Sequence, residues 1–171
     1  MKILTSDAAY SKIDEQNIME LTDRIEKILN NAQIYIPHNI PLELSHHYGI
    51  SNFFQYGCII INLINRAYCK KIIILLPGQE NPLHMHKIKE ETFHILNGDM
   101  LLTVEKEKYN LKAGELFTIE QGMFHSFYSK AGCIFEEIST THIPNDSYYI
   151  DPRIMHLTHK ERKTLVIEWQ Y

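Results

Sequence analysis

Three histidines and one glutamate in the middle of the chain have the residue types and the spacing of a metal site. His84 and His86 are two positions apart, so on a strand, where side chains alternate between faces, both imidazoles point the same way. Glu91 follows after a short connection, and His125 comes later in the same region. Imidazole nitrogen and carboxylate oxygen suit a borderline divalent ion such as Mn, Fe, Ni, Co or Zn. The pattern predicts such an ion on adjacent strands, with coordination positions left for a substrate.

Glycines frame these four residues in a pattern that resembles the cupin superfamily. The first cupin motif is matched at every position by Gly78, His84, His86, Glu91 and Gly98. The second is matched at Gly114, Gly122 and His125, with Glu120 where the family has proline and Ser129 where it has asparagine. The resemblance implies a mainly β fold, the cupin double-stranded β-helix or jelly-roll barrel, in which His84, His86, Glu91 and His125 bind the metal.

Length, composition and charge indicate one globular domain. The chain has 171 residues, of which 44% are hydrophobic, and a formal net charge of −4. That charge favours neither nucleic acid nor an anionic membrane as a partner. No apolar run approaches the about 20 residues that a membrane helix needs, and the N-terminus lacks the apolar core of a secretory signal. Three cysteines without close pairing indicate reduced thiols, and together these features predict a cytoplasmic protein.

Hydrophobic periodicity divides the chain into a helical start and a β-rich remainder. Apolar residues on one helical face predict a helix over 11–30, and a second short helix is expected over 42–53. We therefore expect an N-terminal helical extension over 1–56, packed on a β-barrel over 57–171, within a single domain. Strands are predicted over 58–64, 71–76, 92–96, 100–104, 116–119, 124–128, 134–138 and 164–169. Asn97-Gly98 is typical of a tight hairpin turn between two of these strands.

Two further residues near the ligands could move a proton. Lys89 lies between His86 and Glu91, and Glu137 lies on the strand expected after His125. Beside a Lewis-acidic ion, a carboxylate could remove the proton from the carbon next to a carbonyl, and an ammonium could stabilise the developing charge on oxygen. This chemistry is aldose–ketose isomerisation. The simpler alternatives are a solvated loop lysine at position 89 and a Glu137 that only pairs with a lysine at a sheet edge.

A closer resemblance supports the isomerase interpretation. The run from Gly78 to Glu91 is similar to the D-lyxose isomerase family of cupins, and Glu137-Ile138-Ser139 followed by Asn145-Asp146 resembles two further elements of that family. The resemblance implies a divalent ion, typically Mn²⁺, with Lys89 and Glu137 as the proton-handling pair. The reaction would be of the D-lyxose/D-xylulose or D-mannose/D-fructose type, through a metal-stabilised enediolate.

Other interpretations stay open at this point. The phrase from Glu137 to His142 also resembles cupin domains that accompany sialic-acid-type synthases, which would make the chain a non-catalytic sugar-binding module of surface-glycan biosynthesis. An iron-dependent cupin dioxygenase would use the same ligands. Arg153, Lys160, Arg162 and Lys163 form a loosely basic segment that could contact a phosphate or carboxylate, although a solvated face is the simpler interpretation. A symmetric homodimer is the default assembly.

Overall fold

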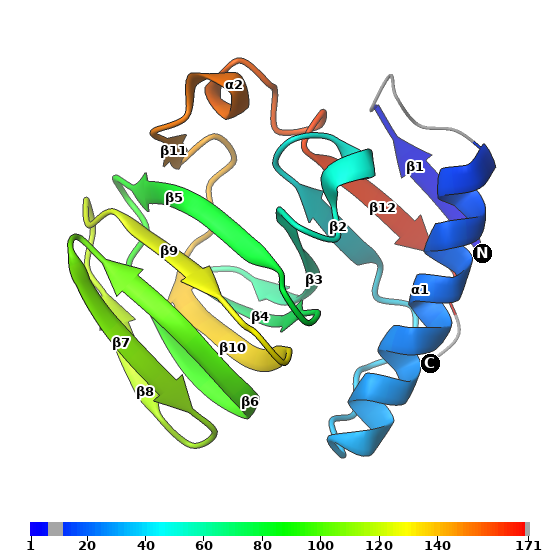
Figure 1. Cartoon of the computed structure of the whole chain (residues 1–171), viewed down its shortest axis with the longest axis horizontal. Coiled ribbons are helices and arrows are strands. Elements are labelled where there is room, and N and C mark those ends of the chain that lie inside the picture. Colours follow the sequence, from blue (N-terminus) through cyan, green and yellow to red (C-terminus); the bar gives the residue numbers. More distant parts are fainter. Residues whose placement is uncertain (7–11, 170–171) are drawn as a thin grey trace.

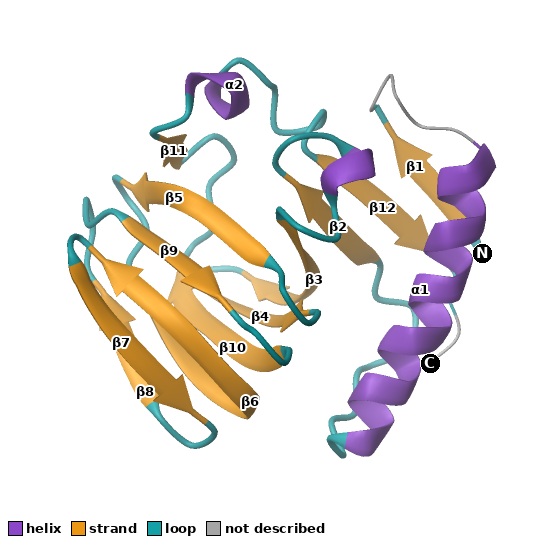
Figure 2. Cartoon of the chain, in the orientation of Figure 1, coloured by secondary structure: helices purple, strands orange, loops and turns teal. Residues whose placement is uncertain are grey.

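The computed structural model describes residues 1–6 and 12–169, which form one long antiparallel sheet with a helix packed along it (Figure 1). Helices and strands are distinguished in Figure 2. In chain order the elements are β1 (Lys2–Thr5), α1 (Lys12–Asn31), β2 (Leu42–His46), the 3-10 helix η1 (Ile50–Asn52), β3 (Gly57–Asn65), β4 (Tyr68–Leu75), β5 (Glu80–His86), β6 (Glu91–Val104), β7 (Glu107–Lys112), β8 (Leu116–Ile119), β9 (His125–Tyr128), β10 (Cys133–Thr140), β11 (Ser147–Tyr149), α2 (Pro152–Met155) and β12 (Lys163–Ile167).

The sheet is curled but does not close into a complete barrel. Its strand order is β1-β12-β2-β3-β4-β10-β6-β9-β5-β11, and β7 and β8 both pair with β6. Figure 1 shows β5 and β9 passing in front of β4 and β10, so the sheet folds back on itself. The mainly β fold with a helix near the N-terminus is therefore as predicted, with β1 and β11 as the free ends of the sheet.

Two hydrophobic clusters lie on opposite faces of this sheet. One face of α1, including Ile18, Ile25 and Leu29, packs against alternate residues of the neighbouring strands, such as Ile72 and Ile74 of β4. The other alternate residues of β4 face the interior of the curl, where they join a second cluster that contains Phe93, Phe127 and Phe135. The period-two alternation of strand side chains thus allows one strand to serve both clusters.

The predicted helix over 11–30 is confirmed as α1, although Ser11 lies outside the described residues. The predicted strands are confirmed by β3, β4, β6, β8, β9, β10 and β12, with small shifts at their ends. The boundary at residue 57 stays a prediction, and β2, which precedes it, pairs with β3 just beyond it. The strands β1, β7 and β11 were not predicted, because all three are short. In addition, apolar and polar residues do not alternate in β1 and β11.

The helix expected over 42–53 is wrong. Residues Leu42–His46 form β2, hydrogen-bonded between β12 and β3, and only Ile50–Asn52 form a single 3-10 turn. All five residues of β2 are buried. The local preference of Leu and Glu for a helix is weak compared with the hydrogen bonds and burial that a place inside a sheet provides.

The hairpin expected at Asn97-Gly98 is also wrong, because β6 runs through it without a turn. Gly98 has a φ of +80°, and a Cβ atom there would collide with the carbonyl oxygen of Gly132. The glycine therefore bends one strand rather than joining two. The first half of β6 pairs with β8 and β10, and the second half pairs with β7 and β9.

Candidate metal centre

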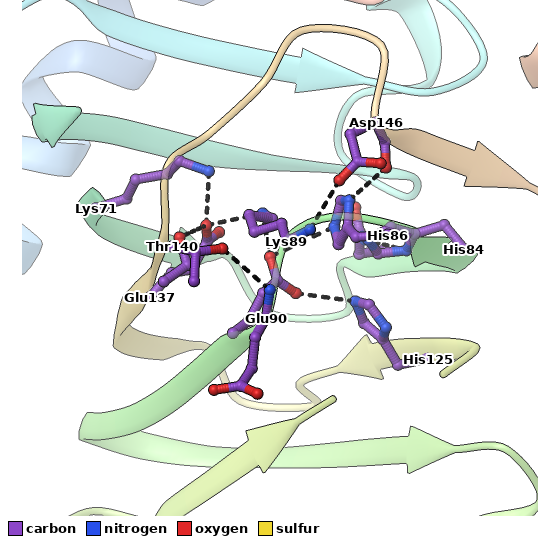
Figure 3. Close-up of polar contacts among 12 residues, drawn as sticks. Lys71, His84, His86, Lys89, Glu90, His125, Glu137, Thr140 and Asp146 are labelled. Carbon is purple, nitrogen blue, oxygen red and sulfur yellow. Dashed lines mark hydrogen bonds and ion pairs between the residues drawn. The ribbon is translucent and has the colours of Figure 1, made fainter. Parts of the chain in front are cut away.

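Strands β5 and β9 place three imidazoles around one point. His84 and His86 lie on one face of β5, and His84 is paired in register with His125 of β9. One ring nitrogen from each lies within 4.8 Å of the others, and all three side chains are buried. Figure 3 shows the three rings side by side. The strand spacing read from the sequence therefore does bring the histidines together.

Backbone carbonyls select the tautomer of each ring. Nδ1 of His84 donates to the carbonyl of Pro82 at 2.9 Å, that of His86 to Asp146 at 2.8 Å, and that of His125 to Met123 at 3.0 Å. A carbonyl can only accept, so each Nδ1 carries a proton, and in the neutral ring Nε2 then keeps its lone pair. Burial, and the neighbouring imidazoles, also lower the pKa of His84 well below its usual value. The neutral imidazole with an unprotonated Nε2 is the form that binds a metal.

Glu91 completes the set of donors from the start of β6. Its Oε2 lies 3.2 Å from Nε2 of His125, and its Oε1 lies 3.4 Å from Nε2 of His86. Within the described part of the chain, neither Oε2 of Glu91 nor Nε2 of His125 has a hydrogen-bond partner, although both are buried. Two buried acceptors that face each other need a positive charge between them. The donor set therefore fits a divalent cation of the borderline class.

An ammonium and a carboxylate adjoin these donors. Nζ of Lys89 contacts Glu91 and lies 2.9 Å from Oε1 of Glu137, while Lys71 of β4 lies 2.7 Å from the same oxygen. Lys71 and Glu137 are direct neighbours in the β4–β10 register. All four of these side chains are buried. The solvated-loop interpretation of Lys89 does not hold, and Glu137 pairs with lysines inside the pocket rather than at a sheet edge (Figure 3).

A buried aspartate shapes the connection that carries Lys89. The carboxylate of Asp146 accepts hydrogen bonds from the backbone N–H groups of Lys87, Ile88 and Lys89, at 3.1, 3.1 and 3.0 Å. Its carbonyl also orients His86. One residue from the segment before β11 therefore positions both a predicted ligand and the predicted catalytic lysine (Figure 3).

The pocket is also lined by Tyr149, His47 and Arg162, none of which the sequence analysis favoured as a site residue. Tyr149 stacks on His84, with ring centroids 5.2 Å apart, and its hydroxyl lies 3.0 Å from Nε2 of His47. The guanidinium of Arg162 lies 4.9 Å from the centroid of the Tyr149 ring. His47 directly follows β2 and is buried, because β2 lies inside the sheet between β12 and β3. The basic segment also divides, since Arg162 is buried whereas Arg153 is exposed and bonded to Asp151.

Comparison with known proteins agrees with this architecture. Residues 71–132 match the family model described as cupin domain. The chain carries a cupin domain. Outside that match, the same fold extends over most of the chain: the Cellulomonas parahominis L-ribose isomerase with L-psicose aligns with a TM-score of 0.70 over 88% of this cupin and 97% of that chain, at 13% identity.

Curated relatives of this cupin protein carry sugar-isomerase names. It is 26% identical over 175 residues to the D-lyxose/D-mannose isomerase of Thermosediminibacter oceani, covering 83% of this chain and 95% of that protein. It is 27% identical over 165 residues to the D-lyxose ketol-isomerase of Cohnella laeviribosi, covering 79% and 91%. The resemblance to cupin sugar isomerases is therefore confirmed along most of the chain.

No helix within 1–6 and 12–169 has the length and apolar character to span a membrane.

Proposed function

We propose that this cupin is a metal-dependent sugar isomerase that interconverts an aldose and a ketose, of the D-lyxose/D-xylulose or D-mannose/D-fructose type. The observation that carries the proposal is Lys89, whose ammonium contacts both Glu91 of the donor set and Glu137 beside it. The proposed proton-handling pair, Lys89 and Glu137, therefore adjoins the donors within one pocket. The names and coverage of the curated relatives support the same reaction.

His84, His86, Glu91 and His125 would hold the ion, with Mn²⁺ as our first choice and Zn²⁺, Fe²⁺, Co²⁺ or Ni²⁺ as alternatives. A divalent ion supplies Lewis acidity, which stabilises negative charge on neighbouring oxygens of a sugar. The three Nδ1 hydrogen bonds to backbone carbonyls keep the imidazoles oriented before any ion or substrate binds.

Glu137 is the proposed base. Burial opposes its charged form, but the ammonium groups of Lys71 and Lys89 outweigh this effect and lower its pKa to about 2. The carboxylate is therefore ionised at neutral pH. Its Oε1 accepts from Lys71, Lys89 and Ser139. These three bonds hold the carboxylate through Oε1, and in the proposed reaction Oε2 would take the proton from the carbon next to the sugar carbonyl.

Lys89 is the proposed partner that handles charge on oxygen. Burial alone would lower its pKa, but the carboxylates of Glu137 and Glu91 raise it above its usual value. The side chain is therefore an ammonium throughout the physiological pH range, and it can donate a hydrogen bond to a sugar oxygen as negative charge develops there.

The test combines metal analysis with an exchange assay. Purified protein is analysed for bound metal, loaded with Mn²⁺, and incubated in deuterated water with D-lyxose, D-mannose and a wider panel of aldoses and ketoses. We expect one divalent ion per chain, ketose formation from at least one aldose, and deuterium at the carbon that loses its proton. A metal-loaded protein that binds sugars without turnover or exchange would contradict the proposal in favour of a non-catalytic module. Oxygen consumption that depends on Fe²⁺ would contradict it in favour of a dioxygenase.

The remaining expectations belong to the same proposal. Cys58, Cys69 and Cys133 are buried free thiols, which supports a reducing compartment such as the cytoplasm. We also propose that the protein forms a homodimer, which sedimentation tests. We further propose that residues 1–56 form a helical extension on a barrel over 57–171, which limited proteolysis tests.

A further inference from the structure

The pocket has a second charged end, formed by the residues just before and within β12. Arg162 lines the same pocket as the histidines and is only 8% exposed. Its Nε atom is buried without a hydrogen-bond partner, and among the described residues no ion pair involves its guanidinium. The guanidinium also contacts the ring of Tyr149. A buried guanidinium normally has a carboxylate or another acceptor, so this group lacks a partner that its chemistry requires.

The carboxylates of the pocket cannot serve as that partner. Each of the three buried glutamates in this region is already bonded to a lysine: Glu43 to Lys163, Glu91 to Lys89, and Glu137 to both Lys71 and Lys89. In these ion pairs the lysine charges balance the glutamate charges, so the positive charge of Arg162 has no counter-charge among them. A divalent ion at the histidines would add further positive charge rather than neutralise it.

The pKa values of two histidines that line the pocket are lowered in part by the same positive charges. Burial, followed by the charge of Lys163, lowers the pKa of His159 to about 4, and its buried Nε2 has no hydrogen-bond partner in the described ranges. Burial, followed by the charges of Lys71 and Lys89, lowers the pKa of His142 to about 3. Both rings line the pocket. They are neutral donors or acceptors at neutral pH, available to a ligand that Arg162 attracts.

One aromatic ring links the two ends of the pocket. The ring of Tyr149 stacks on His84 and also contacts the guanidinium of Arg162. The hydroxyl of the same tyrosine is fixed by His47. A small molecule whose reacting carbons lie at the histidines can therefore extend along Tyr149 and bring its other end to Arg162.

We propose that Arg162 binds an anionic substituent of the substrate, so that the preferred substrate is a sugar bearing a phosphate or a carboxylate at the end remote from the reacting carbons. This inference rests on the proposed isomerase function. Guanidinium groups bind both anions through paired hydrogen bonds, which gives selectivity as well as affinity. Neutral lyxose or mannose would leave the buried charge unpaired.

The experiment compares D-mannose with D-mannose 6-phosphate and with D-mannuronate, which differ only at the remote carbon. For each sugar we measure kcat/KM for ketose formation in the wild type, in Arg162→Met, which retains the length and apolar stem of the side chain, and in Arg162→Lys. Arg153→Met is the matched control, because Arg153 also contacts a tyrosine ring, at 5.0 Å from Tyr48, but is exposed and paired with Asp151.

We expect at least one anionic sugar to exceed D-mannose in kcat/KM by about 100-fold, the size expected for an unpaired buried charge. Arg162→Met should reduce this ratio to below about threefold, Arg162→Lys should keep part of it, and Arg153→Met should leave it unchanged. The phosphate and carboxylate arms identify which anion is preferred. A wild-type ratio near one for both anions, or a ratio that survives in Arg162→Met, would overturn the inference.

Calorimetric binding of the same three sugars to the metal-loaded protein separates this inference from the proposed function. If no sugar is isomerised or exchanges a proton, the isomerase proposal fails. Binding of an anionic sugar that is weakened about 100-fold in Arg162→Met would still establish the anion site. Equal binding of neutral and anionic sugars would reject the site whether or not turnover occurs. Unchanged metal content and melting temperature in Arg162→Met exclude misfolding as the cause.

Discussion

The two interiors on either side of the sheet differ in polarity. Between α1 and the sheet, the buried side chains form a continuous apolar layer in which Ile25 and Leu29 are fully covered. Inside the curl, the second cluster contains phenylalanines, whereas the pocket is also lined by paired lysines and glutamates together with the three histidines. Strand β4 contributes to both, with Ile72 facing the helix and Lys71 facing the pocket.

The difference separates stability from chemistry within one small domain. Burial of apolar surface stabilises the helix-side layer, whereas buried charges are costly even when they are paired. The pocket therefore depends on the rest of the fold for its stability. We expect substitutions on the helix side to lower the free energy of unfolding without changing the kinetics, and substitutions in the pocket to do the reverse.

The largest expected effect is the loss of the metal from the pocket. In His125→Ala, one of four donors is replaced by a methyl group, so we expect metal affinity to fall by at least about 100-fold, and turnover with it. Metal analysis after dialysis measures the loss. His94→Ala is the control, because His94 is paired with Glu136 on the outer face. Equal metal content in the wild type and His125→Ala would remove His125 from the donor set.

The next effect separates proton transfer from metal binding. Glu137→Gln keeps the shape of the side chain but removes its charge, so we expect kcat to fall by about 100- to 10,000-fold while the metal stays bound. Fixed-time assays of ketose formation measure kcat, and metal analysis of the same sample measures the bound ion. Its neighbour Glu136 is paired with Lys70 on the other face of β10, and Glu136→Gln should keep full activity. Full activity in Glu137→Gln would exclude that residue as the base.

The helix side provides the opposite test. Ile25→Ala removes buried methylene and methyl groups from the apolar layer, so we expect the free energy of unfolding to fall by about 2–4 kcal/mol. Urea denaturation measures this change. Metal affinity and kcat/KM measured well below the melting temperature should match the wild type. A change in either would show that the two interiors are coupled through the sheet.

The smallest effect concerns pH and the buried His47. Burial excludes water from its ring and lowers its pKa from 6.5 to about 3, so the unfolded chain binds a proton at pH 5–6 that the folded chain does not. Stability is therefore complete above pH 6.5 and decreases as the pH falls, by up to about 1.4 kcal/mol per pH unit. Of the described residues, Arg162 and Lys163 act on this ring through their charges, and both disfavour its protonated form.

Urea denaturation at pH 7.5, 6.5 and 5.5 measures that slope in the wild type and in His47→Gln. The variant lacks this titration, so its slope between pH 6.5 and 5.5 should be shallower. Carboxylates such as Glu137, whose pKa is lowered to about 2, contribute only below their usual value of 4.5 and do not interfere. Identical slopes would show that His47 does not contribute to the acid sensitivity of the fold.

Most of the strands and the long helix could be predicted, because their apolar residues recur with the period of the element that they form. The two wrong elements have one cause, which is that a local preference was overridden by distant partners. Leu42–His46 forms a strand because β3 and β12 supply hydrogen bonds on both sides. Gly98 bends β6 instead of ending it because the backbone at Gly132, from a distant part of the chain, leaves no room for a side chain.

The sequence by itself determined where the metal-type donors converge, because a two-residue spacing on a strand places His84 and His86 on one face whatever surrounds them. Only the tertiary structure decided which charges have partners. Lys71 and Glu137 are 66 residues apart in the chain, and Glu43 and Lys163 are 120 apart, yet each pair is in contact. The unpaired state of Arg162 could not be predicted, because it is a property of the whole set of neighbours that the fold assembles around it.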